Sequence, residues 1–170
     1  MQTGRATLIA ALLLAAPCIV RAQDRPQDAP PFSIKTFEGR VFRLADLRGR
    51  PVVLDFWATW CRPCRASMPH LDEVQKRFGD KGLVVIGLSV DEDGTAEVKR
   101  FAHALGVSFP LGMANEKVLD LYGPIRYLPT TYFISRQGEV VRRVKGYIDP
   151  ETLDSYVLEL VQRHPADGGR

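Results

Sequence analysis

Residues 52–64, VVLDFWATWCRPC, decide the fold of this chain. The first six form a short apolar run, rich in β-branched and aromatic residues and interrupted by one acid, Asp55. Such a run is typical of a central strand that is buried on both faces. Cys61 and Cys64 follow, and Pro63 between them suits the first turn of a helix, where a missing N–H costs nothing. The stretch therefore predicts a buried strand, a short loop and a helix that begins at Cys61.

The cysteine pair at this helix tip predicts thiol–disulfide exchange. The reaction needs a thiolate, an accessible sulfur and a second thiol that resolves the mixed disulfide. Free N–H groups and the helix dipole stabilise negative charge at a helix N-terminus. They lower the pKa of a cysteine there from about 8.5 toward roughly 3.5–7.5. We predict that Cys61 is the nucleophile, that the more shielded Cys64 is the resolving thiol, and that the positive charge of Arg62 favours the thiolate further.

Two plainer roles compete for the same cysteines. Zinc requires four ligands, but the sequence has no second Cys-x-x-Cys pair and its histidines, His70, His103 and His164, are scattered. A purely structural disulfide would close so small a loop that it would constrain the unfolded chain very little. A redox pair is therefore favoured, and we expect no metal and no cofactor.

The rest of the chain predicts an α/β fold, a central β-sheet with helices on both faces. A hairpin of two short strands comes first, and a helical turn follows it. The helix after Cys61 has an apolar face at spacings of three and four residues, formed by Met68, Leu71, Val74 and Phe78. The expected strands cover residues 32–34, 41–43, 52–57, 83–90, 109–111, 131–135 and 140–145; the remaining expected helices cover 96–105, 115–122 and 150–162; residues 91–94 are expected to form a turn.

The N-terminal residues are predicted to be a targeting segment. Arg5 precedes an apolar run over residues 8–20. A helix of this length rises only about 20 Å, less than the roughly 30 Å hydrocarbon core of a bilayer. A cleaved signal peptide over residues 1–22 is favoured, with an uncleaved anchor as the alternative. Ala15 and Pro17 do not match the positions before a lipidated cysteine, so lipidation of Cys18 is not expected.

This targeting segment sets the compartment and the domain bounds. We expect a periplasmic or otherwise extracytoplasmic, oxidising location, with Cys61 and Cys64 as the remaining cysteines. Residues 23–31 are polar and proline-rich, so we expect a linker there, then one domain over 32–164 and a disordered tail over 165–170. Removing two arginines from the net charge of +3 leaves +1 for residues 23–170, which gives no reason to expect nucleic-acid or membrane binding.

At this point the motifs resemble a known family. Residues 55–64 resemble the active site of the thioredoxin-like superfamily, in the form found in its exported TlpA/ResA-like branch. Pro69 matches the proline that kinks the active-site helix. Residues 128–131, Leu-Pro-Thr-Thr, resemble the cis-proline loop, and residues 39–54 resemble the N-terminal hairpin and first strand. The resemblance implies a thioredoxin-like fold with a central mixed sheet, an N-terminal hairpin and one inserted βα unit near residues 83–111.

The resemblance also implies roles for single residues. Pro129 is expected to be cis and to lie beside the sulfurs, and the backbone of Thr130 to pair with a substrate strand. Asp55 matches the buried acid of thioredoxin that moves a proton at the resolving cysteine, work that a raised pKa favours. Many members of the branch have asparagine there, and some have a glutamate where this chain has Ser67. The alternative for Asp55 is a strand-end acid that reaches solvent or a lysine.

Several neighbours receive less specific expectations. Trp60 is expected to shape the apolar rim and contact substrate, and Trp57 to lie mostly in the core. Glu92 and Asp93 are expected to form a solvated turn, with an acidic wall near the site as the alternative. Tyr122 and Tyr127 flank the proline loop and are expected only to pack.

The resemblance implies a reductant of protein disulfides outside the cytoplasm. Its substrates would include apocytochrome c during haem attachment, or the copper-site cysteines of an oxidase. Its electrons would come from a membrane-embedded thiol donor of the DsbD/CcdA type, and we expect a monomer. Two alternatives remain: a peroxiredoxin-like peroxidase, which shares the fold but uses a different local motif, and a copper-binding chaperone, since two thiols at this spacing can bind Cu(I).

Overall fold

A mixed six-stranded β-sheet forms the centre of the protein, in a computed structural model that describes residues 27–92 and 94–163. The strand order is β1-β8-β7-β4-β5-β6, and β2 and β3 form a separate two-stranded hairpin. β4 pairs in parallel with β5 and antiparallel with β7. The strands are β1 (Gln27–Asp28), β2 (Ser33–Lys35), β3 (Val41–Arg43), β4 (Val52–Trp57), β5 (Val84–Ser89), β6 (Leu111–Met113), β7 (Thr130–Ile134) and β8 (Glu139–Lys145).

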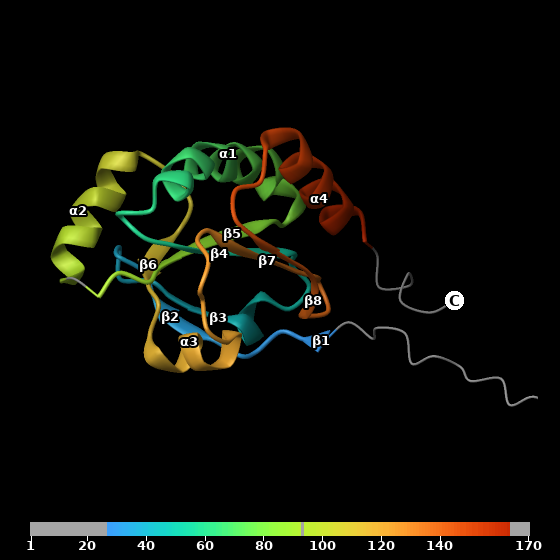
Figure 1. Cartoon of the computed structure of the whole chain (residues 1–170). Helices are drawn as coiled ribbons and strands as arrows, with labels where there is room; N and C mark the ends of the chain where they lie inside the picture. Colours follow the sequence, from blue (N-terminus) through green and yellow to red (C-terminus); the bar gives the residue numbers. More distant parts are fainter. Residues whose placement is uncertain (1–26, 93, 164–170) are drawn as a thin grey trace, which may run out of the picture.

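Helices cover both faces of this sheet, as Figure 1 shows. α1 (Arg62–Phe78) and α4 (Pro150–Gln162) lie on one face, with α2 (Thr95–Leu105) beside them toward the β6 edge. α3 (Glu116–Tyr122) and the β2–β3 hairpin lie on the other face. Short 3₁₀ helices at Leu44–Leu47 and Gly79–Lys81 complete the fold. The predicted α/β architecture is confirmed.

β4 supplies alternate side chains to two apolar cores. Val53 and Trp57 pack in the core under α1 and α4, whereas Val52, Leu54 and Phe56 pack in the core under α3 and the hairpin. Successive residues of a strand point to opposite faces, so a strand covered on both sides is apolar almost throughout. All six residues of β4 are buried, as the sequence predicts.

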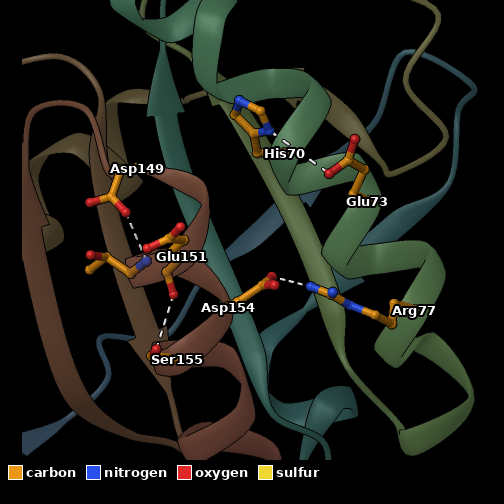
Figure 2. A network of polar contacts seen from close by, with 8 residues as sticks. His70, Glu73, Arg77, Asp149, Glu151, Asp154 and Ser155 are labelled. Atoms are coloured by element: carbon orange, nitrogen blue, oxygen red, sulfur yellow. Dashed lines mark hydrogen bonds and ion pairs between the residues drawn. The ribbon is translucent and has the colours of Figure 1, made fainter.

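α1 is held on the sheet by the apolar stripe predicted from its spacing. Met68, Leu71, Val74 and Phe78 are all buried. Figure 2 shows Arg77 of α1 and Asp154 of α4 pointing toward each other across the two helices. Both side chains are about half exposed, and such surface pairs add little to stability. The apolar contacts of the two helices with the sheet therefore hold this layer together.

The structure differs most from the sequence-based expectation at two places; the other expected helices and strands are found with ends shifted by one residue at most. The strand expected at residues 109–111 is found at Leu111–Met113, because these residues pair with Gly87–Ser89 of β5. The end of the expected linker lies against the domain: β1 pairs with Glu139 and Val140, and the N–H of Ala29 donates to the carbonyl of Gly138. β1 therefore lies at the end of the sheet opposite the carboxyl end of β4, since β8 begins there.

Several expectations concern residues outside the described ranges. The signal peptide or anchor over residues 1–22 with Cys18, the start of the linker, the C-terminal tail and Asp93 all belong to this group. Among the helices of residues 27–92 and 94–163, none has both the length and the apolar character needed to span a bilayer.

Candidate active site

Cys61 and Cys64 are joined by a disulfide at the tip of α1, with an S–S distance of 2.02 Å. Cys61 is the N-cap of the helix, and its sulfur accepts the backbone N–H of Cys64 at 3.2 Å. The N–H of Cys61 donates to the carbonyl of Ala58 at 3.1 Å, which closes the turn between β4 and α1. The outer sulfur therefore lies where the helix dipole and the N–H of Cys64 both stabilise an anion.

Only Cys61 of the pair borders a cleft. Its side chain is 4% exposed and that of Cys64 is 0% exposed. The cleft has a volume of about 780 Å³ and lies between the start of α1, the end of β5 and the α3–β7 connection. Its walls include Trp60, Arg62, Pro63, Val90, Glu92, Leu119, Asp120, Ile125, Arg126 and Leu128. An incoming sulfur can thus approach Cys61 but not Cys64.

The loop before β7 forms another side of this cleft. The Leu128–Pro129 peptide bond is cis, as the resemblance implied. Leu128 lines the cleft together with Cys61, so the loop lies beside the disulfide. Thr130 already pairs with Phe56 of β4 and Lys145 of β8, and its hydroxyl donates to the carbonyl of Tyr127. That its backbone also pairs with a substrate strand stays a prediction.

Asp55 is completely buried in the middle of β4. Thr131 Oγ1 donates to its Oδ1 at 2.7 Å, and Oδ2 has no hydrogen-bond partner among the described residues. Burial raises the pKa of Asp55 from 3.8 to about 7, and the hydrogen bond from Thr131 acts in the opposite direction. The alternative of a strand-end acid that reaches solvent or a lysine is wrong.

The strand alternation places Asp55 on the same side of the sheet as the disulfide helix. Val53 and Trp57, two residues before and after it, belong to the core that also contains Cys64. Asp55 must therefore point toward that layer. Asp55 and the Cys64 sulfur therefore lie on the same side of the sheet, as a proton relay between them requires.

The flanking residues are distributed largely as predicted. Trp60 is 68% exposed at the mouth of the cleft, and Trp57 is fully buried and stacks on Phe101. Tyr122 is buried against Phe56, as predicted, whereas Tyr127 is 62% exposed, so the prediction that it only packs is wrong.

Glu92 is exposed, which agrees with the solvated segment that we favoured, and it also lines the cleft, which agrees with the alternative of an acidic wall near the site. No group of three potential metal-ligating side chains gathers within the described residues.

One buried acid near the site was not singled out from the sequence. Asp91 accepts hydrogen bonds from the backbone and side chain of Thr59, two residues before Cys61. The sequence placed residues 91–94 in an ordinary turn. The signal was available, because β4 and β5 are parallel, and residues that follow parallel strands meet at one edge of a sheet.

Comparisons with known proteins agree with this geometry. Residues 26–143 match the model of the AhpC/TSA family. A thiol-disulfide oxidoreductase ResA of Bacillus thuringiensis is 36% identical over 135 residues, which cover 79% of this chain and 77% of the relative.

Two solved structures extend the similarity to three dimensions. A putative thiol:disulfide interchange protein DsbE from Chlorobium tepidum is 31% identical, with a TM-score of 0.74, covering 81% of this chain and 98% of that one. The exposed lipoprotein thioredoxin Etrx1 of Streptococcus pneumoniae is 30% identical, with a TM-score of 0.67, covering 76% of this chain and 99% of that one. The chain belongs to the AhpC/TSA family and is a thioredoxin-fold thiol–disulfide oxidoreductase of the ResA-like branch.

Proposed function

We propose that this oxidoreductase works outside the cytoplasm and reduces disulfides of exported proteins, with Cys61 as the nucleophile and Cys64 as the resolving thiol. The observation that carries the proposal is the position of Cys61, which caps α1 and borders the cleft while Cys64 lies beneath it. Apocytochrome c or the copper-site cysteines of an oxidase are the proposed substrates. A membrane-embedded thiol donor of the DsbD/CcdA type is the proposed source of electrons.

The exchange proceeds in two balanced steps. The Cys61 thiolate attacks one sulfur of the substrate disulfide, forms a mixed disulfide and releases the other substrate sulfur as a thiolate. Cys64 then loses its proton and attacks the Cys61 sulfur, which forms the Cys61–Cys64 disulfide and releases the second substrate thiolate. The substrate gains two electrons, the enzyme loses two, and the released thiolates take up protons according to their own pKa values.

Asp55 is the proposed acceptor of the Cys64 proton. A base is effective when its pKa lies near the working pH, and that of Asp55 is raised to about 7. Its Oδ2 atom has no protein partner among the described residues, so it has an open lone pair for a proton. Trp60, Arg62, Pro63, Pro129 and Thr130 are the proposed surroundings of the reacting sulfurs.

The proposed location rests on the sequence before Gln27 and on one relative. Residues 1–22 have the pattern of a signal peptide, which we infer is cleaved, and a similar solved protein is described as an exposed lipoprotein thioredoxin. We infer a short linker before β1, one thioredoxin-like domain and a short tail, and a monomer as the working form.

A thiol-trapping experiment tests the roles of the two sulfurs. Cys64→Ala should hold substrates as mixed disulfides on Cys61, because the resolving thiol is missing. Cys61→Ala is the matched control and should trap few or none. The captured proteins, identified by mass spectrometry from an extracytoplasmic extract, would name the substrates. More partners on Cys61→Ala than on Cys64→Ala would reverse the assignment.

Peroxide reduction is a second candidate, because peroxiredoxin-like peroxidases share this fold and the chain matches the AhpC/TSA family model. In the described structure the disulfide joins two cysteines three residues apart at one helix tip, an arrangement suited to dithiol exchange. We expect the purified, reduced protein to consume hydrogen peroxide slowly and to reduce a protein disulfide such as that of insulin much faster. The opposite ranking would favour the peroxidase.

A further inference from the structure

Asp91 is a buried carboxylate that the exchange chemistry above does not use. It lies two residues after Ser89, the last residue of β5, and only 6% of its surface is exposed. Its Oδ2 accepts the backbone N–H of Thr59 at 2.9 Å, and its Oδ1 accepts the hydroxyl of Thr59 at 2.7 Å. The hydroxyl of Ser89 donates to Oδ2 at 2.6 Å. The two bonds from Thr59 connect Asp91 to the turn before Cys61, and the bond from Ser89 holds the Asp91 carboxylate in place.

The backbone hydrogen bonds between β4 and β5 stop just before Thr59, and the Asp91 side chain takes the place of the next backbone acceptor. The last bond of the parallel pair runs from the N–H of Val90 to the carbonyl of Trp57 at 2.8 Å. The N–H of Thr59 lies beyond that point and bonds to the Asp91 carboxylate instead. This N–H is partly buried, and a donor left there without a partner is costly, so the bond favours one position of the turn.

The geometry points to Asp91 as a positioning residue for Cys61, an inference that rests on the proposed role of Cys61 as the nucleophile. By holding Thr59, Asp91 holds the turn closed by the Cys61–Ala58 hydrogen bond, and thereby keeps the Cys61 sulfur at the tip of α1. Stabilisation of a thiolate by a helix end decays within the first turn, so a small displacement of the sulfur weakens it.

The same contact sets both sides of the cleft mouth. Trp60 follows the clamped Thr59, and Glu92 follows Asp91; both line the cleft beside Cys61. The Asp91–Thr59 contact therefore fixes two things together: the position of the Cys61 sulfur and the distance between Trp60 and Glu92 across the cleft.

The charge of Asp91 and its hydrogen bonds act in opposite directions on Cys61. A nearby negative charge raises the pKa of a thiol, so removing the charge alone lowers or preserves it. Loss of the hydrogen bonds frees the turn and raises the pKa of Cys61. Asp91→Asn keeps an acceptor for the Thr59 N–H without the charge, whereas Asp91→Ala removes both.

The test measures the rate at which iodoacetamide alkylates Cys61 of the reduced, full-length protein between pH 4 and 9, with the site identified by mass spectrometry. At a pH at least one unit below the pKa of Cys61 in the unmodified protein, Asp91→Ala should slow alkylation about tenfold, the change that a rise of one unit in that pKa produces there. Asp91→Asn should react at least as fast as the unmodified protein.

The chain offers a matched control. Asp72 is also buried and likewise accepts both the N–H and the hydroxyl of one residue, Ser108, at 2.6 and 2.7 Å, but on the helix α1 away from its tip. Asp72→Ala removes the same kind of clamp and should leave the alkylation profile of Cys61 unchanged. A merely structural role of Asp91 would make the two alanine variants alike.

Thr59→Val provides a second variant in case Asp91→Ala does not fold. It removes the hydroxyl bond but keeps the backbone bond, so it should slow alkylation by roughly threefold, about half a unit in pKa. In the Asp91→Ala background it should slow the reaction no further, because both changes remove the same contact.

The outcomes separate this inference from the proposed function. Slower alkylation in Asp91→Ala, with Asp91→Asn and Asp72→Ala unaffected, supports the clamp. A folded Asp91→Ala with the unmodified profile, or an Asp91→Asn as slow as Asp91→Ala, overturns it. An ordinary thiol pKa for Cys61 in the unmodified protein would instead overturn the proposed nucleophile.

Discussion

Asp55 combines complete burial with a single hydrogen bond, and this makes the stability of the protein depend on pH. Its pKa is 3.8 in the unfolded chain and about 7 in the folded protein, where burial disfavours the charge. Well below pH 4, Asp55 is protonated in both the folded and the unfolded protein, so its burial carries no charge-related cost to stability. Between pH 4 and 7 the unfolded chain binds fewer protons than the native state, so the free energy of unfolding falls as pH rises. Above pH 7 the loss levels off.

Asp55→Asn should remove this pH dependence. The shift corresponds to about 4 kcal/mol at most, so the variant should become more stable than the unmodified protein above pH 7 but not at pH 4. Urea unfolding at several pH values measures the difference. The variant should also keep mixed disulfides longer, because Cys64 loses its proton acceptor. Parallel stability curves for the two proteins from pH 4 to 8 would contradict the prediction.

Thr131 provides the control for this experiment. Its hydroxyl bond is the contribution that lowers the pKa of Asp55. Thr131→Val should therefore extend the fall in stability to higher pH rather than remove it.

At the scale of single residues, the sequence predicted the pairing of Cys61 with Cys64 and the burial of Asp55 better than the contacts of the acids beside them. Cys61, Cys64 and Asp55 stand out because their types are unusual for their places in a helix cap and an apolar strand. Asp91 and Glu92 do not stand out, since an acidic turn after a strand is ordinary. Their places beside the cleft depend on the parallel pairing of β4 and β5, a contact between residues more than 30 positions apart.

Among the elements, α3 is the short one that forms a wall of the cleft. It has seven residues, and Asn115 caps it by accepting the N–H of Val118 at 2.9 Å. The Asn115 amide also donates to the carbonyl of Ser33 at 3.0 Å, which joins the helix to β2. Leu119 of this helix lines the cleft. A short helix depends strongly on its cap and its packing.

Asn115→Ala should lower the free energy of unfolding by about 1 kcal/mol, the usual cost of losing a helix cap. Asn115→Asp keeps the cap acceptor and loses only the bond to Ser33, so it should recover most of the loss. Urea midpoints measure both variants. An aspartate variant as unstable as the alanine variant would show that the bond to Ser33, not the cap, holds α3.

Element bounds were predictable where the signal is local. β4 and α4 have the predicted ends, because β4 is a compact β-branched run and α4 begins with Asp149 and Pro150, a cap followed by a favoured first residue. β1 was missed because Gln27 and Asp28 are polar and their strand conformation comes from pairing with β8. β6 was misplaced because Phe109 is buried outside the strand.

At the scale of the whole molecule, the hairpin and the main sheet meet at one glycine. Gly112 of β6 bridges to Thr36, and the N–H of Phe37 donates to the carbonyl of Leu111. A Cβ on Gly112 would lie 2.7 Å from the carbonyl oxygen of Lys35, which is backbone and cannot swing away. The two sheets therefore approach as closely as glycine allows.

Gly112→Ala should force the sheets apart and lower the free energy of unfolding by about 1 to 3 kcal/mol, the range for overpacked sites. Gly94→Ala is the control for steric overlap, because nothing lies within 4 Å of a Cβ at that position and its φ is −55°; since Gly94 is the N-cap of α2, this variant should lose less than about 1 kcal/mol through the cap alone. Thermal unfolding compares the two. Equal melting temperatures for both variants would mean that the hairpin shifts without cost.

The place of β1 has a consequence for how the protein meets its partners. Gln27 joins the sheet at the start of β8, whereas Cys61 lies at the carboxyl end of β4, so the two are at opposite ends of the strands. If residues 1–22 stayed in a lipid bilayer as an anchor, the domain would be attached near Gln27, and the two cysteines would lie at the opposite end of the domain. Soluble substrates could then reach the disulfide directly. A thiol donor in the same bilayer could reach it only after the tethered domain had rotated to bring the cysteines toward the membrane.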